Sequence, residues 1–449
     1  MNRSDGLLLL KRLFAMTWVI LIVAAILMGL GSTVEIHAGL LVGLGMLAYL
    51  ASWGLAFGLR FDKHESLLIA CGLCTLSVAF ACFLIELPGT LGVVDYRVTF
   101  STPAPAWKRP GNAPDRDLLF VREGNQTLLW RFQGNDLHRL KGMSGSKVYS
   151  NELKFDANGF RNRDEQRRSE IVLIGDSFLE APHTADGQLI SSRLAAITGR
   201  GVSNLGRSGY GPIQELIVLE RFGLPLNPKE VVWTFYEGND LADIREYNAA
   251  RERLLNEKPS TPVSRCVGRS FTNNALEFLI RGWLRPEATR DPRLHLGHFE
   301  TRDGEDLSIY FSSDDYNIAS GPRANSQEFL QFGSILRTAG DLCREHSARL
   351  TLVFIPTKWR IFRSHCGFEG GSRCLAWGLD DLPREIETLK KSLPDGINFL
   401  DLTTALEQAA AAGDLVYLAD DTHWSDQGHA IAALAVAESL YGKLVETKR

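Results

Sequence analysis

The chain has 449 residues, of which 45% are hydrophobic, and a formal net charge of −4 from 49 basic and 53 acidic side chains. This near-balance excludes a strongly basic surface, so the charge gives no reason to expect a nucleic acid partner. The length suffices for a membrane region followed by one large domain or two small ones.

Three long apolar runs lie within the first 90 residues. They comprise residues 13–30, 37–59 and 67–85, and none contains lysine, arginine, aspartate or glutamate. Each is about as long as a helix that crosses a bilayer, roughly 20 residues. A signal peptide followed by buried helices is the alternative, but no small-residue cleavage site follows the first run. We therefore expect a three-helix transmembrane region over residues 1–88.

The charges that flank these runs predict the orientation of the chain. Lysine and arginine precede the first run, and Arg60 and Lys63 follow the second, whereas residues 31–36 carry neither type. Positively charged flanks favour the cytoplasm, so we expect the N-terminus inside and everything after the third run outside. In a bacterium, this predicts a multi-pass protein of the inner membrane with its large domain in the periplasm.

Four of the seven cysteines follow the third run, in a compartment that would allow disulfides. Cys366 and Cys374 bracket a glycine-rich loop and form the expected pair, with Cys266 and Cys343 as a second, weaker pairing. No histidine cluster accompanies these cysteines, which disfavours zinc.

Residues 89–169 are rich in proline, glycine and short alternating patterns. The segment 101–110 is typical of an extended linker. Residues 118–122 and 127–132 favour strands, and residues 148–161 favour a further hairpin with a turn at Asn158-Gly. We expect a linker and a small β-rich lead-in here.

From Glu170 onward, short apolar strands alternate with helical patterns. Strands are expected at residues 171–174, 201–206, 230–236, 350–355 and 398–401, and helices at 188–197, 213–222, 326–348, 382–393 and 426–441. Residues 242–324 are polar and are expected to form an irregular insertion. Five apolar strands separated by helices predict an α/β domain over residues 170–449, with a parallel sheet covered on both faces.

Chemically useful residues follow the first three of these strands. Ser177 comes after Gly175-Asp176, in a turn that can hold a hydroxyl at the C-terminal edge of the sheet. The loop around Gly209 is glycine-rich and can present amide hydrogens to an anion. Asn239 can direct its side-chain amide at a developing oxyanion. Taken singly, each also fits a tight turn or a helix cap.

A fourth block, Asp420-Asp-Thr-His423, lies near the C-terminus. His423 can act as a general base while Asp420 holds its other ring nitrogen. The neighbouring Asp421 is expected to be structural, although an exchange of roles between the two aspartates stays open. A polar loop that caps the last helix is the alternative for the whole block. His183, on the loop after Ser177, is expected at the rim.

Together the blocks Gly-Asp-Ser, Asn-x-Gly-x-x-Gly, Gly-Asn-Asp and Asp-x-x-His, in this order, resemble the SGNH (GDSL) hydrolase superfamily. The resemblance covers roughly residues 150–445 and implies a three-layer α/β/α fold with five parallel strands. It implies a nucleophile at Ser177 and an oxyanion hole from the Ser177 amide, the Gly209 amide and the Asn239 side chain. Asp420 and His423 would complete the triad, with no metal or organic cofactor.

The Asp-x-x-His-Trp block and the membrane runs are also similar to proteins of alginate and related exopolysaccharide O-acetylation. In those proteins the Asp-His element precedes the serine, whereas here it follows, which weakens the analogy with transferases. Tyr210, Lys358 and Trp424 lie beside the site loops in the sequence. They are candidate substrate contacts, Lys358 for an anionic group, with packing as the alternative for the aromatic residues.

We therefore expect a membrane-anchored, extracytoplasmic serine esterase or O-acyltransferase that acts on ester-linked acetyl groups of a surface polysaccharide or glycan. A transferase would need a membrane partner to supply the acyl donor. One alternative is a lipase or lysophospholipase at the membrane surface, against which the polar residues 251–323 count. Another is a non-catalytic glycan-binding assembly protein, against which the complete residue set counts.

Overall fold

The computed structural model describes residues 85–94, 96–100, 111–133, 137, 148–162, 168–256, 267–284, 293–313, 326–368, 370, 372, 374 and 382–442. Within these residues, no helix is both long and apolar enough to cross a membrane. The three predicted spans lie outside the described residues, apart from Ile85, as does the predicted linker at 101–110.

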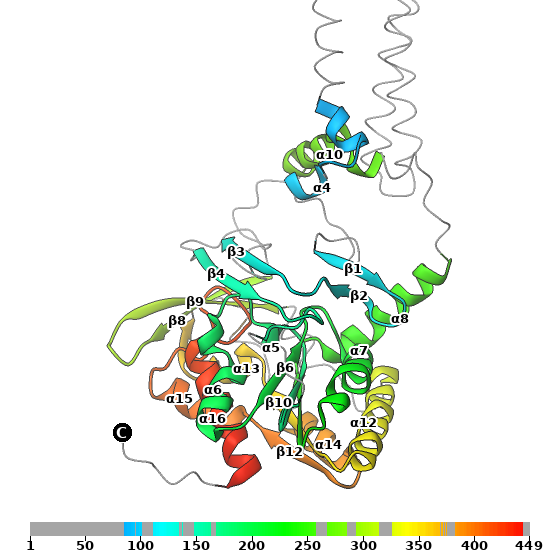
Figure 1. The fold of residues 1–449 in the computed structure, drawn as a ribbon. Helices are drawn as coiled ribbons and strands as arrows, with labels where there is room; N and C mark the ends of the chain where they lie inside the picture. The colour runs from blue at the N-terminus through cyan, green and yellow to red at the C-terminus, as the bar shows by residue number, and fades with distance from the viewer. Residues whose placement is uncertain are drawn as a thin grey trace, which may run out of the picture. The chain divides into compact units, whose positions relative to one another are not determined.

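A five-stranded parallel sheet forms the centre of the larger of two compact units, residues 106–256 with 288–449 (Figure 1). Its strand order is β12-β10-β7-β5-β6, and all neighbouring strands run parallel. The strands are β5 (Ile171–Gly175), β6 (Val202–Gly206), β7 (Glu230–Tyr236), β10 (Arg349–Ile355) and β12 (Ile397–Asp401). The predicted five-stranded parallel sheet is confirmed.

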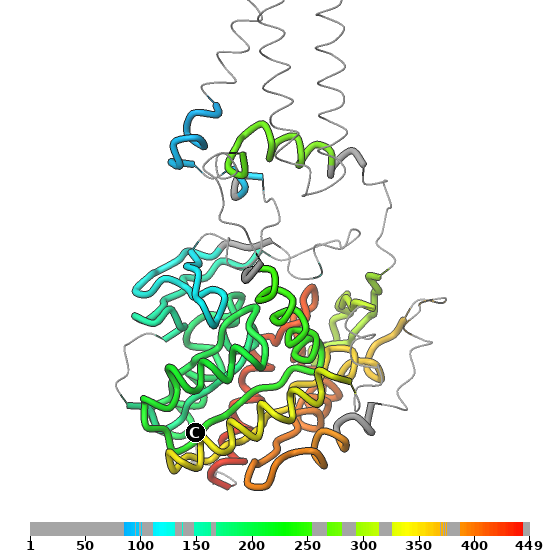
Figure 2. The backbone as a smooth tube through the Cα atoms, turned by 90° about the vertical axis from the view of Figure 1, so that its right-hand side faces the viewer, coloured from blue at the N-terminus to red at the C-terminus, as the bar shows by residue number. Residues whose placement is uncertain are grey.

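Helices cover both faces of this sheet. Alternate residues of a strand point to opposite faces, so Ile171 and Leu173 join one apolar core while Val172 and Ile174 join the other. The first core is completed by α6 (Ile190–Thr198), α13 (Lys358–Phe362), α15 (Thr403–Ala411) and α16 (Asp426–Tyr441). The second is completed by α7 (Pro212–Val218), α8 (Asp240–Asn256), α12 (Gln327–Glu345) and α14 (Leu382–Ser392). Figure 2 views the sheet from the side that carries α12. This is a three-layer α/β/α arrangement.

Short helical turns complete the unit. They are α5 (Ser177–Glu180), the 3-10 turns η3 (Asp186–Gln188) and η5 (Leu224–Leu226), and the π-helical turn η4 (Leu219–Gly223).

Two antiparallel hairpins precede the sheet in the chain. One pairs β1 (Asn112–Asp115) with β2 (Leu119–Arg122), and the other pairs β3 (Thr127–Gln133) with β4 (Val148–Lys154). The expected hairpin within residues 148–161 is therefore wrong, because β4 pairs with β3. Leu118, Leu119 and Phe120 are buried in the second core, so the first hairpin packs directly against the α/β layers.

The irregular structure expected for residues 242–324 is also wrong for its described part. It contains most of α8, then α10 (Phe271–Leu284), β8 (Leu294–Glu300) and β9 (Asp306–Ser312). These two strands form a small antiparallel sheet with β11 (Cys366–Phe368). Helix α8 was missed because it buries a sparse apolar stripe of Leu241, Ile244 and Tyr247 among many charged side chains.

Residues 257–287 group with residues 1–105 in a second, smaller compact unit. It contains α10 and the short helix α4 (Tyr96–Thr99), and residues 85–90 and 267–269 are also helical.

The predicted disulfides are not formed in this structure. Cys366 and Cys343 both carry thiols, so the Cys366–Cys374 and Cys266–Cys343 pairings are wrong as observed here. Cys343 is buried on α12, where it packs in the second core as a small apolar side chain.

Candidate active site

The nucleophile candidate stands at the end of β5, the strand that lies between β7 and β6 in the sheet. Strand β5 ends at Gly175, and Ser177 begins α5. Glycine is required at this turn because a Cβ at Gly175 would lie 1.9 Å from the Thr234 hydroxyl oxygen. Asp176 caps the helix by accepting the Phe178 N–H at 2.9 Å. These contacts fix the backbone that presents the Ser177 hydroxyl.

His423 connects Ser177 to a buried carboxylate. Its Nε2 lies 2.7 Å from the Ser177 Oγ, and its Nδ1 lies 2.5 Å from Oδ1 of Asp421. A carboxylate accepts hydrogen bonds, so the proton sits on Nδ1 and Nε2 is left to accept the serine proton. Burial alone would raise the pKa of Asp421, but the charge and hydrogen bonds of His423 outweigh it and hold that pKa well below its usual range. The arrangement is that of a Ser-His-Asp triad.

The carboxylate in contact with His423 is Asp421, and the assignment of Asp420 to this place is corrected. Oδ1 of Asp421 also accepts the backbone N–H of His423 at 2.7 Å, a local turn that folds the aspartate back under the ring two residues ahead. Asp420 accepts the hydroxyl of Tyr149, on β4, at 3.0 Å. The hairpin of β3 and β4 therefore contacts, through Asp420, the loop that carries His423.

The predicted oxyanion-hole residues follow the strands on either side of β5. Gly209 follows β6 and has a φ of +82°, which favours glycine. Asn239 follows β7 and donates from Nδ2 to Oδ2 of Asp243 at 2.7 Å. An asparagine amide carries two N–H groups, so this bond orients the amide and leaves one donor for another acceptor. Because the strands are parallel neighbours, their C-terminal ends bring both residues to the edge that carries Ser177.

Four acidic side chains lie around this edge: the buried Asp176, Glu215 on α7 and Asp240 on α8, and the half-buried Asp243 on α8. Burial raises the pKa of each, and for the last three the negative charge of acidic neighbours raises it further. Each of these carboxyls therefore holds its proton more tightly than an exposed one does.

Glu180 was not predicted as a site residue, yet it ties the loop of Gly209 in place. Its buried carboxylate accepts from Arg122 at 2.6 Å, from Arg207 at 2.9 Å and from the backbone N–H of Ser208 at 2.6 Å. It thus joins α5, β2 and the glycine-rich loop. Burial would raise the pKa of Glu180, but Arg207 and Arg122 outweigh it and lower that pKa to about 2.

Substitution of Glu180 by glutamine is expected to destabilise the protein in a pH-dependent way. A carboxyl whose pKa is lowered by folding stabilises the fold above its unfolded pKa of about 4.5, and this contribution disappears as the pH falls towards 2. We expect E180Q to lower the free energy of unfolding at pH 7 by on the order of 3 kcal/mol, and by much less at pH 3. Urea unfolding of both proteins at the two pH values measures this. An equal difference at both values would contradict the prediction.

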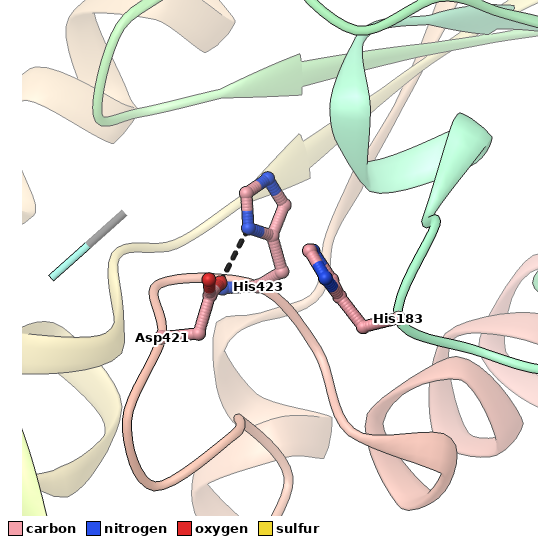
Figure 3. Close-up of side chains that lie close together, drawn as sticks. All are labelled: His183, Asp421 and His423. Atoms are coloured by element: carbon pink, nitrogen blue, oxygen red, sulfur yellow. Dashed lines mark hydrogen bonds and ion pairs between the residues drawn. The ribbon is translucent and has the colours of Figure 1, made fainter. Parts of the chain in front are cut away.

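His183 lies against the base rather than only at the rim. Its ring and that of His423 have centroids 5.1 Å apart. Figure 3 shows the two side chains beside each other. The ligand atoms of His183, Asp421 and His423 lie within 4.8 Å of one another, and they form the one such group found among the described residues. Both ring nitrogens of His423 are already hydrogen-bonded, to Ser177 and Asp421. A metal bound here would have to break the triad, so the group fits proton transfer better.

The three predicted substrate contacts are placed in packing or support roles. The ammonium of Lys358 is buried and donates to the carbonyls of Leu418 at 2.6 Å, Ala419 at 2.9 Å and Asp421 at 3.1 Å. It therefore holds the loop of residues 418–421 in place, a support role that differs from the predicted contact with an anionic substrate. Tyr210 and Trp424 are 1% and 0% exposed, so the packing alternative describes them.

Residues 310–448 match a family model described as the SGNH hydrolase-like domain of the acetyltransferase AlgX. This part of the chain is SGNH hydrolase-like. The match contains the SGNH-like pair Asp421 and His423, while Ser177, Gly209 and Asn239 lie before it. The predicted resemblance to the SGNH superfamily is confirmed.

The chain is also similar to the probable alginate O-acetylase AlgJ of Pseudomonas putida. The two are 29% identical over 130 residues, which are 29% of this chain and 31% of that protein. The SGNH-like chain thus spans about a third of the length of this relative. The predicted similarity to proteins of exopolysaccharide O-acetylation is confirmed.

Proposed function

We propose that this protein is a serine-dependent acyl-transfer enzyme that adds acetyl groups to a polysaccharide, or removes them, outside the cytoplasm. The observation that carries the proposal is the hydrogen-bonded series Asp421–His423–Ser177 at the C-terminal edge of the sheet. These residue types in this order of contact are suited to forming and breaking esters.

The proposed reaction begins with attack of the Ser177 Oγ on an ester carbonyl. Nε2 of His423 takes the serine proton, and Asp421 stabilises the resulting imidazolium. The amides of Ser177 and Gly209 and the side chain of Asn239 stabilise the tetrahedral oxyanion. The C–O bond to the leaving alcohol then breaks, His423 returns the proton to that alcohol, and an acyl group remains on Ser177.

The second half-reaction decides between hydrolysis and transfer. Water attacking the acyl-enzyme releases the free acid, whereas a sugar hydroxyl takes the acyl group as a new ester. His423 acts as the base in both cases, so the same residues serve both outcomes.

The choice of substrate and location rests on similarity and sequence. The relatives are named for the acetyltransferase AlgX and for a probable alginate O-acetylase, which favours an O-acetylated polysaccharide. The three predicted spans favour anchoring in a bacterial inner membrane, with the catalytic unit in the periplasm. A transferase of this kind would receive its acyl group from a membrane partner.

A donor–acceptor assay tests the function. The full chain in detergent is mixed with an aryl acetate, with and without a de-acetylated polyuronate, and with Ser177→Ala as the blank. We expect release of the aryl alcohol in both mixtures and, for a transferase, new acetyl esters on the polymer by NMR. Release without polymer acetylation would identify an esterase. If the blank matches the intact chain in both readouts, the proposal is wrong.

A further inference from the structure

The smaller compact unit carries a concentration of exposed apolar side chains. Ten large apolar residues are exposed among the described residues, and five of them belong to this unit. They are Ile85, Leu91, Val93, Phe278 and Leu279, which are 41%, 67%, 77%, 57% and 55% exposed. Such a density of exposed apolar surface in a small unit marks an interaction surface.

Helix α10 is fastened to the chain directly after the third apolar run. The carboxylate of Glu86 accepts the backbone N–H groups of Phe271 at 2.9 Å and Thr272 at 2.6 Å, and the hydroxyl of Ser270 at 3.0 Å. Glu86 thus caps, from 185 residues away, a helix N-terminus that would otherwise leave its amides unsatisfied.

Aromatic packing strengthens this attachment. The ring of Phe271 meets those of Tyr96 and Phe100 edge-on, with centroids 5.3 Å apart in both pairs. The backbone oxygen of Arg269 lies only 2.7 Å from the position that a Cβ on Gly89 would occupy, so the two segments approach closely at this glycine. The start of α10 therefore has a fixed place beside residues 86–100, and Figure 1 labels it next to α4.

We propose that α10 lies in the headgroup region of a lipid bilayer and binds lipid through Leu279 and Phe278, together with Leu91 and Val93. Glu86 follows the last residue of the charge-free run 67–85, so its cap holds α10 at the outer end of that predicted span. The helix has 14 residues, fewer than the roughly 20 needed to cross a bilayer. A short helix with exposed apolar side chains at this place suits the interface between lipid and water.

Lipid is favoured over a protein partner by this position. Three of the five exposed side chains lie in residues 85–93 and two lie on α10, so both segments that Glu86 joins carry exposed apolar surface. Ile85 is itself the last residue of the apolar run 67–85. The chain leaves α8 at Asn256 and re-enters the larger unit at residue 288, so α10 is a second membrane attachment within the sequence of the SGNH-like unit. This inference does not depend on the proposed catalysis.

Photo-crosslinking of the full chain in nanodiscs tests this inference. A benzophenone amino acid replaces Leu279, and the nanodiscs contain alkyne-tagged phosphatidylethanolamine and phosphatidylglycerol. Two control positions carry the same probe: Leu330, 65% exposed on α12, and Glu277, two residues before Leu279 and about 200° around the helix. A further probe at Val93 repeats the test should the first variant fold poorly.

We expect tagged lipid to crosslink at positions 279 and 93 at least fivefold more than at position 330, and more at 279 than at 277. Crosslinking at 279 and 93 no stronger than at 330 would overturn the inference. Crosslinking of those two probes to another protein chain instead of lipid would overturn it as well.

Discussion

Substitution of Ser177 by alanine is expected to lower kcat for an aryl acetate by about 10⁶-fold, as loss of a triad nucleophile does in serine hydrolases. The hydroxyl oxygen, 2.7 Å from Nε2 of His423, is the atom that we propose attacks the carbonyl, and alanine leaves nothing in its place. The change removes one small polar atom at the surface of a helix start, so the fold should persist. Initial rates of ester hydrolysis measure the effect.

Ser192→Ala is a suitable control for this experiment. Ser192 lies on α6 and donates its hydroxyl to the carbonyl of Asp186, away from the triad. We expect this variant to retain its kcat within about twofold, since no triad contact is lost. Activity of Ser177→Ala within tenfold of the native chain would mean that another group performs the attack.

Asp421→Asn is expected to lower kcat by about 10⁴-fold while leaving the fold intact. An asparagine amide can donate to Nδ1 of His423, which moves the ring proton to Nε2, where it blocks acceptance of the serine proton. The loss should therefore lie in kcat far more than in KM.

Asp420→Asn is the matched control because it changes the neighbouring carboxylate. Asp420 accepts the hydroxyl of Tyr149, whereas Asp421 is the carboxylate at Nδ1 of His423, so we expect kcat to fall by less than about tenfold and stability to fall by about 1 kcal/mol. Kinetics of both variants on one substrate measure the contrast. If Asp420→Asn loses more activity than Asp421→Asn, Asp420 is the triad carboxylate, as the Asp-x-x-His spacing predicts, and the assignment of Asp421 is wrong.

The sheet was predictable because each of its strands is an apolar run bounded by turn residues. Strands such as β5 and β7 are buried on both faces, and a buried parallel strand leaves a continuous apolar signature in the sequence. Helix α8 leaves no such signature, since few of the side chains described between Asp240 and Arg253 are buried. A long helix with few buried side chains therefore has a sequence pattern similar to that of a polar loop.

Ser177 and His423 were predictable because each lies in a short motif at a strand or helix end. The choice between Asp420 and Asp421 was not predictable, because it depends on a local turn in which the Asp421 carboxylate accepts the backbone N–H of His423. Glu180 and Lys358 act through contacts with residues 27 to 63 positions away, which no local pattern reports. A charged residue directly after Phe178 and Leu179, at the end of α5, was the available signal for Glu180.

We propose that Ser177 carries the acyl group during turnover, and trapping that intermediate tests this most directly. The purified full chain is mixed with an aryl acetate, quenched in acid within the first turnover, and digested for mass spectrometry. We predict one acetyl group per chain on the peptide that contains Ser177, and none in Ser177→Ala. Turnover of the ester with acetyl on another residue, or with no acetylated peptide in either protein, would contradict the claim.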